Sequence, residues 1–193
     1  MYVVFEGTNG VGKSTQLPLV VSLLNKYFKE YGEDIKINSY HEGDTCKKEY
    51  DNFYEEVLDY ARDRAKCQEM TFGEGFKSIT IADRSYYSSL VYQGFVDMNY
   101  IRNVNKFVEE PELIFLFENN AYDYNTKLYL DILPYSKTTP IHTKYQPIEK
   151  TTSVITDTIF LYWLEEYSEE LEPYSVFDKI KKAVNEKETE VKE

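Results

Sequence analysis

The feature that most constrains the fold is an abrupt change of residue type near the N-terminus, within VVFEGTNGVGKSTQL at residues 3–17. β-Branched and aromatic side chains fill a pleated surface, so residues 2–5 favour a β-strand, and the glycines that follow cannot continue it. Beyond the glycines, apolar residues recur at helical spacing, which predicts a helix over residues 13–31. The chain must therefore turn between a strand and a helix.

The spacing in this turn fits a phosphate-binding loop, because Gly7 is followed after four residues by Gly12, Lys13 and Ser14. Glycines let backbone N–H groups close around phosphate oxygens at the start of a helix. Lys13 is predicted to reach the transferred end of a nucleotide, and the Ser14 hydroxyl to face Mg²⁺. The alternative is an ordinary glycine turn, which the strand before the loop and the helix after it disfavour.

The rest of the chain alternates between predicted strands and helices. The expected strands cover residues 34–40, 78–82 and 111–117, and the expected helices cover 47–70, 152–167 and 176–184, with a pair of helices between residues 86 and 110. This alternation implies right-handed crossovers and a parallel, doubly wound sheet, so the fold class is α/β. Ligands in such proteins bind at the carboxyl ends of the strands.

Residues 121–150 break the pattern, with three prolines and no clear period. We predict either a lid over the active site or a variable surface region there, and no fifth strand. The length of 193 residues fits one domain spanning residues 1–193.

Composition limits the partners of the chain. A formal net charge of −12 argues against an extended nucleic-acid surface, so an anionic ligand must be met by a local cluster of positive charge. The chain has only four arginines against 18 lysines, which gives weight to each arginine near a motif. Two cysteines, no basic leader and no long apolar run predict a soluble cytoplasmic protein with reduced thiols and no membrane span.

Three further clusters fall where loops should meet at one sheet edge. Asp83 and Arg84 end the third predicted strand, where a carboxylate can bind in the Mg²⁺ shell and an arginine can bind phosphate. The alternative is an Asp-Arg ion pair that caps the next helix. Tyr60 and Arg64 share one helix face and could stack on and hydrogen-bond a nucleobase, or form a solvated face. Glu42 follows the second strand and is either a catalytic carboxylate or part of a polar turn.

Taken together, these residues resemble the thymidylate kinase family of P-loop nucleoside monophosphate kinases. The resemblance rests on FEGTNGVGKST, ARDRA, DRSYYSSLVYQG and PELIFLF, in the order and approximate spacing of the family, and it covers about residues 1–118. It implies a P-loop kinase fold, a three-layer α/β/α arrangement with a lid at about residues 121–150. It also implies ATP as phosphoryl donor, Mg²⁺, nucleotide substrates and, because family members are commonly homodimers, a homodimer.

The resemblance assigns roles residue by residue. Donor phosphates would be held by the loop residues Gly7, Thr8, Asn9, Gly10, Val11, Gly12, Lys13, Ser14 and Thr15, and Mg²⁺ by Ser14 and Asp83. The acceptor would be bound by Asn9, Tyr60, Arg64, Arg84, Ser88, Tyr92 and Gln93, with Tyr60 stacked on its base, Arg64 at a base oxygen and Arg84 at its phosphate. The catalytic set would be Lys13, Asp83, Arg84 and Glu42.

The sequence also departs from the family pattern. SYHEGDT, at residues 39–45, keeps the glutamate of the Arg-Glu-Pro-Gly-Gly-Thr type motif but lacks its arginine. Neither the lid nor the phosphate loop supplies an arginine for the migrating phosphoryl group, and the loss could cost on the order of 10³ or more in rate. Lys127, Lys137 or Lys144 could substitute as point charges.

Three functions follow from these observations. The first is Mg-ATP-dependent phosphorylation of a pyrimidine deoxynucleoside monophosphate, with dTMP as the expected acceptor. The second is a deoxynucleoside kinase, because DRSYYS also resembles that family, which uses a carboxylate after the second strand as its base, here Glu42. The third is a nucleotide-binding protein that has lost efficient catalysis.

Overall fold

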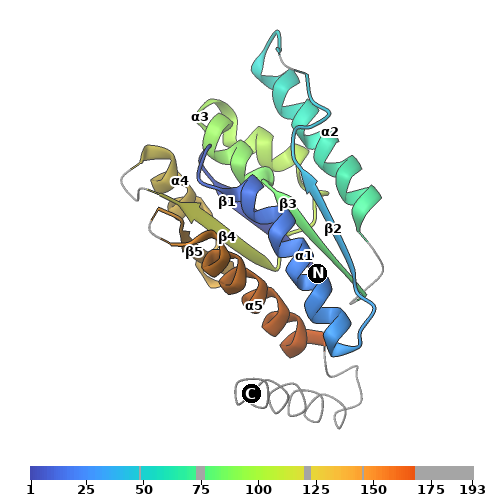
Figure 1. The fold of residues 1–193 in the computed structure, drawn as a ribbon. Coiled ribbons are helices and arrows are strands. Elements are labelled where there is room, and N and C mark those ends of the chain that lie inside the picture. The colour runs from blue at the N-terminus through green and yellow to red at the C-terminus, as the bar shows by residue number, and fades with distance from the viewer. Residues whose placement is uncertain (48, 73–76, 120–122, 145, 168–193) are drawn as a thin grey trace, which may run out of the picture.

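The computed structural model describes residues 1–47, 49–72, 77–119, 123–144 and 146–167. Strands and helices alternate along the described chain (Figure 1). Their bounds are β1 Tyr2–Gly7, α1 Lys13–Tyr31, β2 Lys36–His41, α2 Phe53–Thr71, β3 Ser78–Asp83, α3 Tyr86–Val104, β4 Leu113–Glu118, α4 Tyr124–Ile132, β5 Thr138–His142 and α5 Ile148–Tyr167. A short 3₁₀ turn at Tyr135–Lys137 joins α4 to β5.

The sheet is parallel throughout, with the strand order β2-β3-β1-β4-β5. Successive residues of β1 point to opposite faces. Val3 and Phe5 pack with α1 and α5, whereas Tyr2 and Val4 pack with α2, α3 and α4. Figure 1 shows α1 and α5 lying side by side along one face of the sheet. The predicted three-layer α/β/α architecture is confirmed.

The prediction that there is no fifth strand was wrong. β5 runs parallel to β4, and its Pro140 lies opposite Leu116. Proline has no N–H to donate, but β5 is an edge strand with β4 as its sheet neighbour, and such a strand tolerates a missing donor. The described part of residues 121–150 thus forms a helix and a strand of the domain. A lid function for this region stays a prediction.

Helix boundaries were predicted less well than strand positions. α2 begins at Phe53 instead of residue 47, because the Asn52 side chain accepts a hydrogen bond from the Glu55 N–H at 3.0 Å and caps the helix. α3 is divided by a kink at Asp97, where φ is −157° and ψ is 88°, as the predicted helix pair requires, but it ends at Val104 instead of residue 110. The helix predicted at residues 176–184 lies outside the described residues. Among the described helices, none combines the length and apolarity needed to cross a bilayer.

The sheet brings the predicted motifs to one edge. His41 at the end of β2 pairs with Asp83 at the end of β3, and Phe5 in β1 also pairs with Asp83. The phosphate-binding loop between Gly7 and Lys13 follows β1 directly. The loops after β1, β2 and β3 therefore meet at the carboxyl ends of their strands, as the doubly wound architecture requires.

Candidate active site

The loop after β1 has the backbone of a phosphate-binding loop. Gly10 and Gly12 have φ values of 76° and 101°, in the left-handed region that favours glycine, and Gly12 is the N-cap of α1. The Lys13 ammonium donates to the carbonyl oxygens of Gly7 and Thr8 at 3.0 and 2.9 Å. This places a positive charge at the start of a helix whose N–H groups face the same space.

A cavity of about 260 Å³ adjoins this loop. It is lined by Asn9, Gly10, Gly12, Lys13, Ser14, Thr15, His41, Asp83 and Arg84. Three residues of the predicted loop, Gly7, Thr8 and Val11, do not line this cavity. Val11 belongs to the hydrophobic core, and Gly7 and Thr8 offer their carbonyls to Lys13. Gly7 is also required by packing, since a Cβ there would lie 2.2 Å from the carbonyl oxygen of Phe117 in β4.

Lys13 is strongly perturbed. Burial and, after it, the charge of the neighbouring Arg84 guanidinium lower the pKa of its ammonium to about 8, against the opposing effect of Asp83. An anionic ligand would reverse this shift, because a nearby negative charge favours the protonated form. The cavity thus has an excess of positive charge, which suits a polyphosphate.

Asp83 connects the loop with β2. Its Oδ2 accepts a hydrogen bond from the Ser14 hydroxyl at 2.7 Å. The same oxygen lies 3.1 Å from His41 Nδ1. Burial acts to raise the pKa of Asp83, but the hydrogen bonds from His41 and Ser14 outweigh it and hold the pKa below its ordinary value. The same hydrogen bond raises the pKa of His41. His41 was not predicted as a site residue.

The oxygen atoms at this point suit Mg²⁺. Asp83 Oδ1 is buried and has no hydrogen-bond partner among the described residues, and the Ser14 hydroxyl lies beside the same carboxylate. Mg²⁺ is held by one or two protein oxygens together with phosphate oxygens and waters. No group of three or more His, Cys, Asp or Glu residues in the described part of the chain forms a metal cluster. Ser14 and Asp83 therefore fit a magnesium ion that arrives with a nucleotide.

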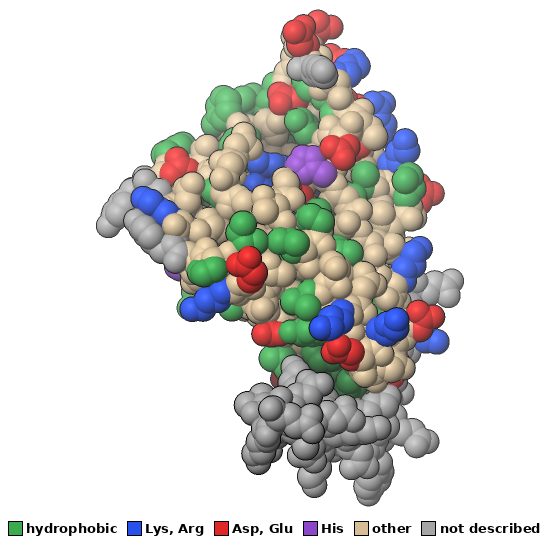
Figure 2. Space-filling view, in the orientation of Figure 1, with side chains coloured by type: hydrophobic (Ala, Val, Ile, Leu, Met, Phe, Trp, Pro, Cys, Tyr) green, Lys and Arg blue, Asp and Glu red, His purple; other side chains and the backbone are tan. Residues whose placement is uncertain are grey.

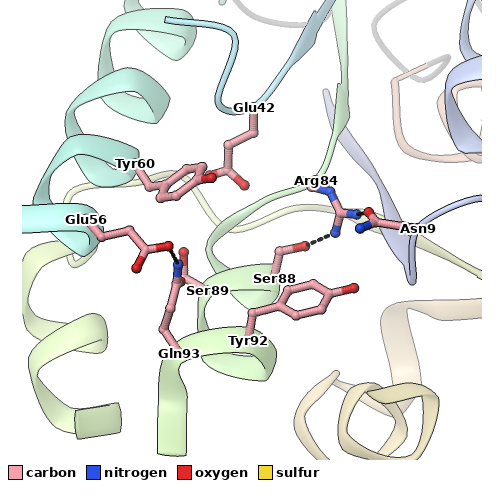
Figure 3. Close-up of a pocket in the computed structure, with 9 residues that line it drawn as sticks. All are labelled: Asn9, Glu42, Glu56, Tyr60, Arg84, Ser88, Ser89, Tyr92 and Gln93. Atoms are coloured by element: carbon pink, nitrogen blue, oxygen red, sulfur yellow. Dashed lines mark hydrogen bonds between the residues drawn. The ribbon is translucent and has the colours of Figure 1, made fainter. Parts of the chain in front are cut away.

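A second cavity, of about 270 Å³, opens beside the first (Figure 3). It is lined by Asn9, Glu42, Glu56, Tyr60, Arg84, Ser88, Ser89, Tyr92 and Gln93. In Figure 3, Arg84 and Asn9 lie at one end, and Glu56, Gln93 and Ser89 lie at the other, where Gln93 Nε2 donates to Glu56 Oε1 at 2.8 Å. The cavity thus has a cationic end and a polar end that can hydrogen-bond a base.

Arg84 belongs to both cavities. Its guanidinium donates to Asn9 Oδ1 at 2.5 Å and to Ser88 Oγ at 3.0 Å, and it lies 5.4 Å from the centre of the Tyr92 ring. Figure 2 shows Lys or Arg side chains beside a histidine in the upper part of the visible face. Asn9 and Arg84 line each cavity, so a ligand in one would approach a ligand in the other at this arginine.

Arg64 is placed differently from what the resemblance implied. Its side chain is fully buried, forms an ion pair with Glu42, and donates to Asn105 and to Ser89 Oγ, the latter at 3.3 Å. Burial lowers the pKa of Arg64 to about 10. Glu42 lines the second cavity and Arg64 does not. A direct contact between Arg64 and an acceptor base stays a prediction.

The remaining predicted acceptor residues, Asn9, Tyr60, Arg84, Ser88, Tyr92 and Gln93, all line the second cavity. Of the lysines proposed as substitutes for an arginine, Lys137 donates to the Pro111 carbonyl at 3.0 Å. Pro111 precedes β4, at the opposite end of the sheet from the cavities, so Lys137 is held away from them.

Sequence reasoning missed three polar residues that line the cavities, His41, Glu56 and Ser89, and two buried residues that contact Ser88 from behind the second cavity, Glu6 and Tyr129. Glu6 gave a usable signal, since it is a carboxylate inside an apolar strand and is fully buried. Burying a charge is costly unless it has partners. Glu56 lies one helical turn before Tyr60, and Tyr60 was a predicted site residue. Charged residues at this spacing are common on a helix rich in charge, so the spacing did not single out Glu56. Tyr129 gave no signal.

The chain is similar to proteins of one known family. Residues 5–127 match the family profile described as thymidylate kinase. A probable thymidylate kinase of Methanocaldococcus jannaschii is 32% identical over 119 residues, covering 60% of this chain and 63% of that protein. A thymidylate kinase of an Exiguobacterium species is 31% identical over 139 residues, covering 62% and 64%. The chain spans about 60% of the length of the curated relatives it matches.

Solved structures agree on the fold. Thymidylate kinase from Ehrlichia chaffeensis aligns with a TM-score of 0.66 at 20% identity, covering 83% of this chain and 98% of that one. The enzyme from Candida albicans aligns with a TM-score of 0.64 at 14% identity, covering 83% and 91%. At these identities the likeness establishes the fold alone. The family profile matches well over half of the residues of this chain, so the chain belongs to the thymidylate kinase family.

Proposed function

We propose that this protein transfers the γ-phosphoryl group of Mg-ATP to a pyrimidine deoxynucleoside monophosphate, with dTMP as the acceptor. The observation that carries the proposal is the pair of adjoining cavities that share Arg84 and Asn9. One cavity has the phosphate-binding loop, and the other has Tyr60, Tyr92 and polar groups at its far end. Phosphoryl transfer needs donor and acceptor phosphates in line with positive charge between them.

Each residue has a distinct task in this proposal. The loop amides and Lys13 hold the donor phosphates, and Arg84 draws the acceptor phosphate toward them. Ser14 and Asp83 hold Mg²⁺, which neutralises charge on the donor phosphates when bound. Tyr60 and Tyr92 bracket the base, and the Glu56–Gln93 pair at the polar end hydrogen-bonds its edge.

An assay of the purified protein with Mg-ATP and dTMP tests this function. We expect formation of dTDP, and a Lys13→Ala control should lose nearly all of it, because the donor phosphates lose their cation. No dTDP above that control would refute the proposal. A turnover number within the ordinary enzyme range of roughly 1 to 10³ per second would exclude the nucleotide-binding protein with weak catalysis.

One observation favours a second candidate, phosphorylation of a nucleoside. Glu42 lines the acceptor cavity at the end of β2. Arg84 lines both cavities and the other three arginines line neither, so a phosphate on the acceptor would have a single arginine to bind it. A carboxylate there could accept the proton of a sugar hydroxyl. Comparison of thymidine with dTMP as acceptor decides between the two, since exclusive use of the monophosphate excludes the nucleoside kinase.

A further inference from the structure

Tyr129 of α4 reaches the site from the interior of the protein. α4 packs against α3 and β1, and the Tyr129 side chain has no exposed surface. Its hydroxyl lies 2.8 Å from Ser88 Oγ and 3.4 Å from an Arg84 nitrogen. A buried tyrosine hydroxyl requires a hydrogen-bond partner, and here both partners line the acceptor cavity.

The direction of these hydrogen bonds is fixed by Glu6. Its Oε1 accepts from the backbone N–H and hydroxyl of Ser85 at 2.8 and 2.6 Å, and its Oε2 accepts from the Ser88 hydroxyl at 2.7 Å. Ser88 has a single hydroxyl proton. With Glu6 as the carboxylate, that proton goes to Glu6 Oε2, and the Ser88 oxygen can only accept from Tyr129 and Arg84. The Tyr129 proton therefore points to Ser88, and its oxygen faces the guanidinium.

Arg84 is consequently surrounded by uncharged acceptors. Its NH1 meets the Gly7 carbonyl at 3.3 Å, Ser88 and Tyr129, and its NH2 meets the amide oxygen of Asn9. Among the described residues Arg84 forms no ion pair, whereas Arg62 and Arg64 pair with Asp59 and Glu42. Neutral contacts fix the direction of the guanidinium without cancelling its charge, which leaves that charge for an anionic ligand.

We propose that Tyr129 is a positioning residue, which acts with Glu6 through Ser88 to aim Arg84 at the acceptor phosphate. The role of the phosphate rests on the proposed function, but the aiming of Arg84 does not. Because Tyr129 lies on α4, the placement of α4 against α3 sets the direction of an arginine at the centre of the site. α4 is thus a determinant of selectivity for a phosphorylated acceptor over its nucleoside.

The substitution Tyr129→Phe removes the hydroxyl and keeps the ring. We expect the Kd for dTMP to rise about 3- to 10-fold, the range given by loss of one net hydrogen bond. The Kd for thymidine, which has no phosphate for Arg84 to bind, should change less than twofold. Calorimetry measures both. A merely structural role for Tyr129 would weaken both ligands alike, and that result would overturn the proposal.

The matched control is Tyr167→Phe, which removes a hydroxyl that donates to Glu112 at 2.7 Å, away from both cavities. This variant should leave both dissociation constants unchanged. If it weakens dTMP as much as Tyr129→Phe does, the selectivity does not come from Arg84.

A measurement without ligand separates this proposal from the proposed function. The chain has four arginines, so its ¹⁵N spectrum contains four arginine Nε–H signals, and Arg84→Lys identifies the one from Arg84. In Tyr129→Phe we expect that signal to move or broaden, while the other three arginine signals stay in place. An unchanged Arg84 signal overturns the positioning role. If the native protein binds no monophosphate but the signal responds, the proposed function fails and the positioning role stands.

A second variant covers the case that Tyr129→Phe does not fold. Glu6→Gln keeps the shape of the side chain, but its amide group can donate to Ser88 and so reverse the hydrogen-bond direction. The Ser88 proton would then point toward Tyr129, and the Tyr129 proton would point toward Arg84. The Arg84 signal should change in the same way. Its failure to change in a folded Glu6→Gln protein contradicts the proposal.

Discussion

Arg84 shows how much the site asks of single residues. It has a φ of 85°, and in the described part of the chain it is the one residue other than glycine with a positive φ. Such a conformation costs about 1–3 kcal/mol and persists where the surroundings fix it. Here the Arg84 N–H donates to the Phe5 carbonyl at 2.9 Å, and four acceptors hold the guanidinium. This backbone conformation directs the Arg84 side chain back over the phosphate-binding loop, where it contacts Gly7 and Asn9.

Lys13 gives a testable dependence on pH. Burial, followed by the charge of Arg84, lowers the pKa of Lys13 to about 8 in the free protein, and a bound polyphosphate should raise it again. ATP binding should therefore take up protons above pH 8, and the Kd for Mg-ATP should rise up to about tenfold between pH 7.5 and pH 9. Calorimetry in buffers of different ionisation enthalpy measures both quantities.

The control for this prediction is Lys13→Met, which should bind Mg-ATP more weakly but with little dependence on pH over the same range. An equal fall of affinity in the variant would assign the titration to another group. For stability the sign is opposite, because the unfolded lysine keeps its proton to about pH 10.4. The lowered pKa makes the free energy of unfolding increase as the pH rises from about 8 toward that value.

At the scale of elements, α5 completes the layer that supports the phosphate-binding loop. α1 begins at Lys13, and its buried residues pack against α5 on one face of the sheet. The centre of this contact is Trp163, which is fully buried, with its ring centre 4.9 Å from that of Phe28. The Thr152 hydroxyl also donates to Gln16 Oε1 at 2.7 Å, one turn into α1. The position of the loop therefore depends on α5.

Truncation of Trp163 tests this dependence. Trp163→Ala should lower the free energy of unfolding by about 3–5 kcal/mol, because it leaves a cavity between two helices. Urea denaturation followed by circular dichroism measures the change. Leu161→Ala on the same helix is the control, since Leu161 is 62% exposed and its truncation should cost no more than about 0.5 kcal/mol. Similar losses in the two variants would show that α5 is not anchored through Trp163.

At the scale of the whole molecule, an excess of negative charge surrounds a small cationic site. The formal net charge is −12, and Figure 2 shows acidic and basic side chains scattered over the visible face. Anions are therefore repelled by the protein at long range and attracted by Lys13 and Arg84 at short range. Self-repulsion of this size also opposes the compact state.

Salt should consequently stabilise the protein. The Debye length falls from about 30 Å at 0.01 M to about 10 Å at 0.1 M, so added NaCl screens repulsion between distant carboxylates before it affects contacts within the site. We expect Tm to rise by a few degrees between these concentrations in a calorimetric scan. Sucrose at equal osmolality controls for solvent effects. A fall of Tm with NaCl would mean that surface ion pairs outweigh the net charge.

Much of the fold could be predicted from the sequence because its signals are local. The strand, glycine turn and helix that form the phosphate-binding loop lie within about thirty consecutive residues, and α1 has the predicted bounds. The central strands β1, β3 and β4 are buried along their whole length, and β1 and β4 appear as apolar runs, while β3 carries Ile79 and Ile81 between polar residues. β5 was missed since an edge strand needs fewer buried residues, and Pro140 is unusual in any strand.

The sequence by itself determined the class of site, because a Gly-rich loop between a strand and a helix can adopt few other structures and favours phosphate. Tertiary structure alone decided which polar side chains face the ligand. Arg64 pairs with Glu42 and Asn105 instead of lining the cavity, and Arg84 is held by Tyr129, 45 residues away. Such contacts depend on how helices from distant parts of the chain pack on the sheet, and no local pattern of residues records them.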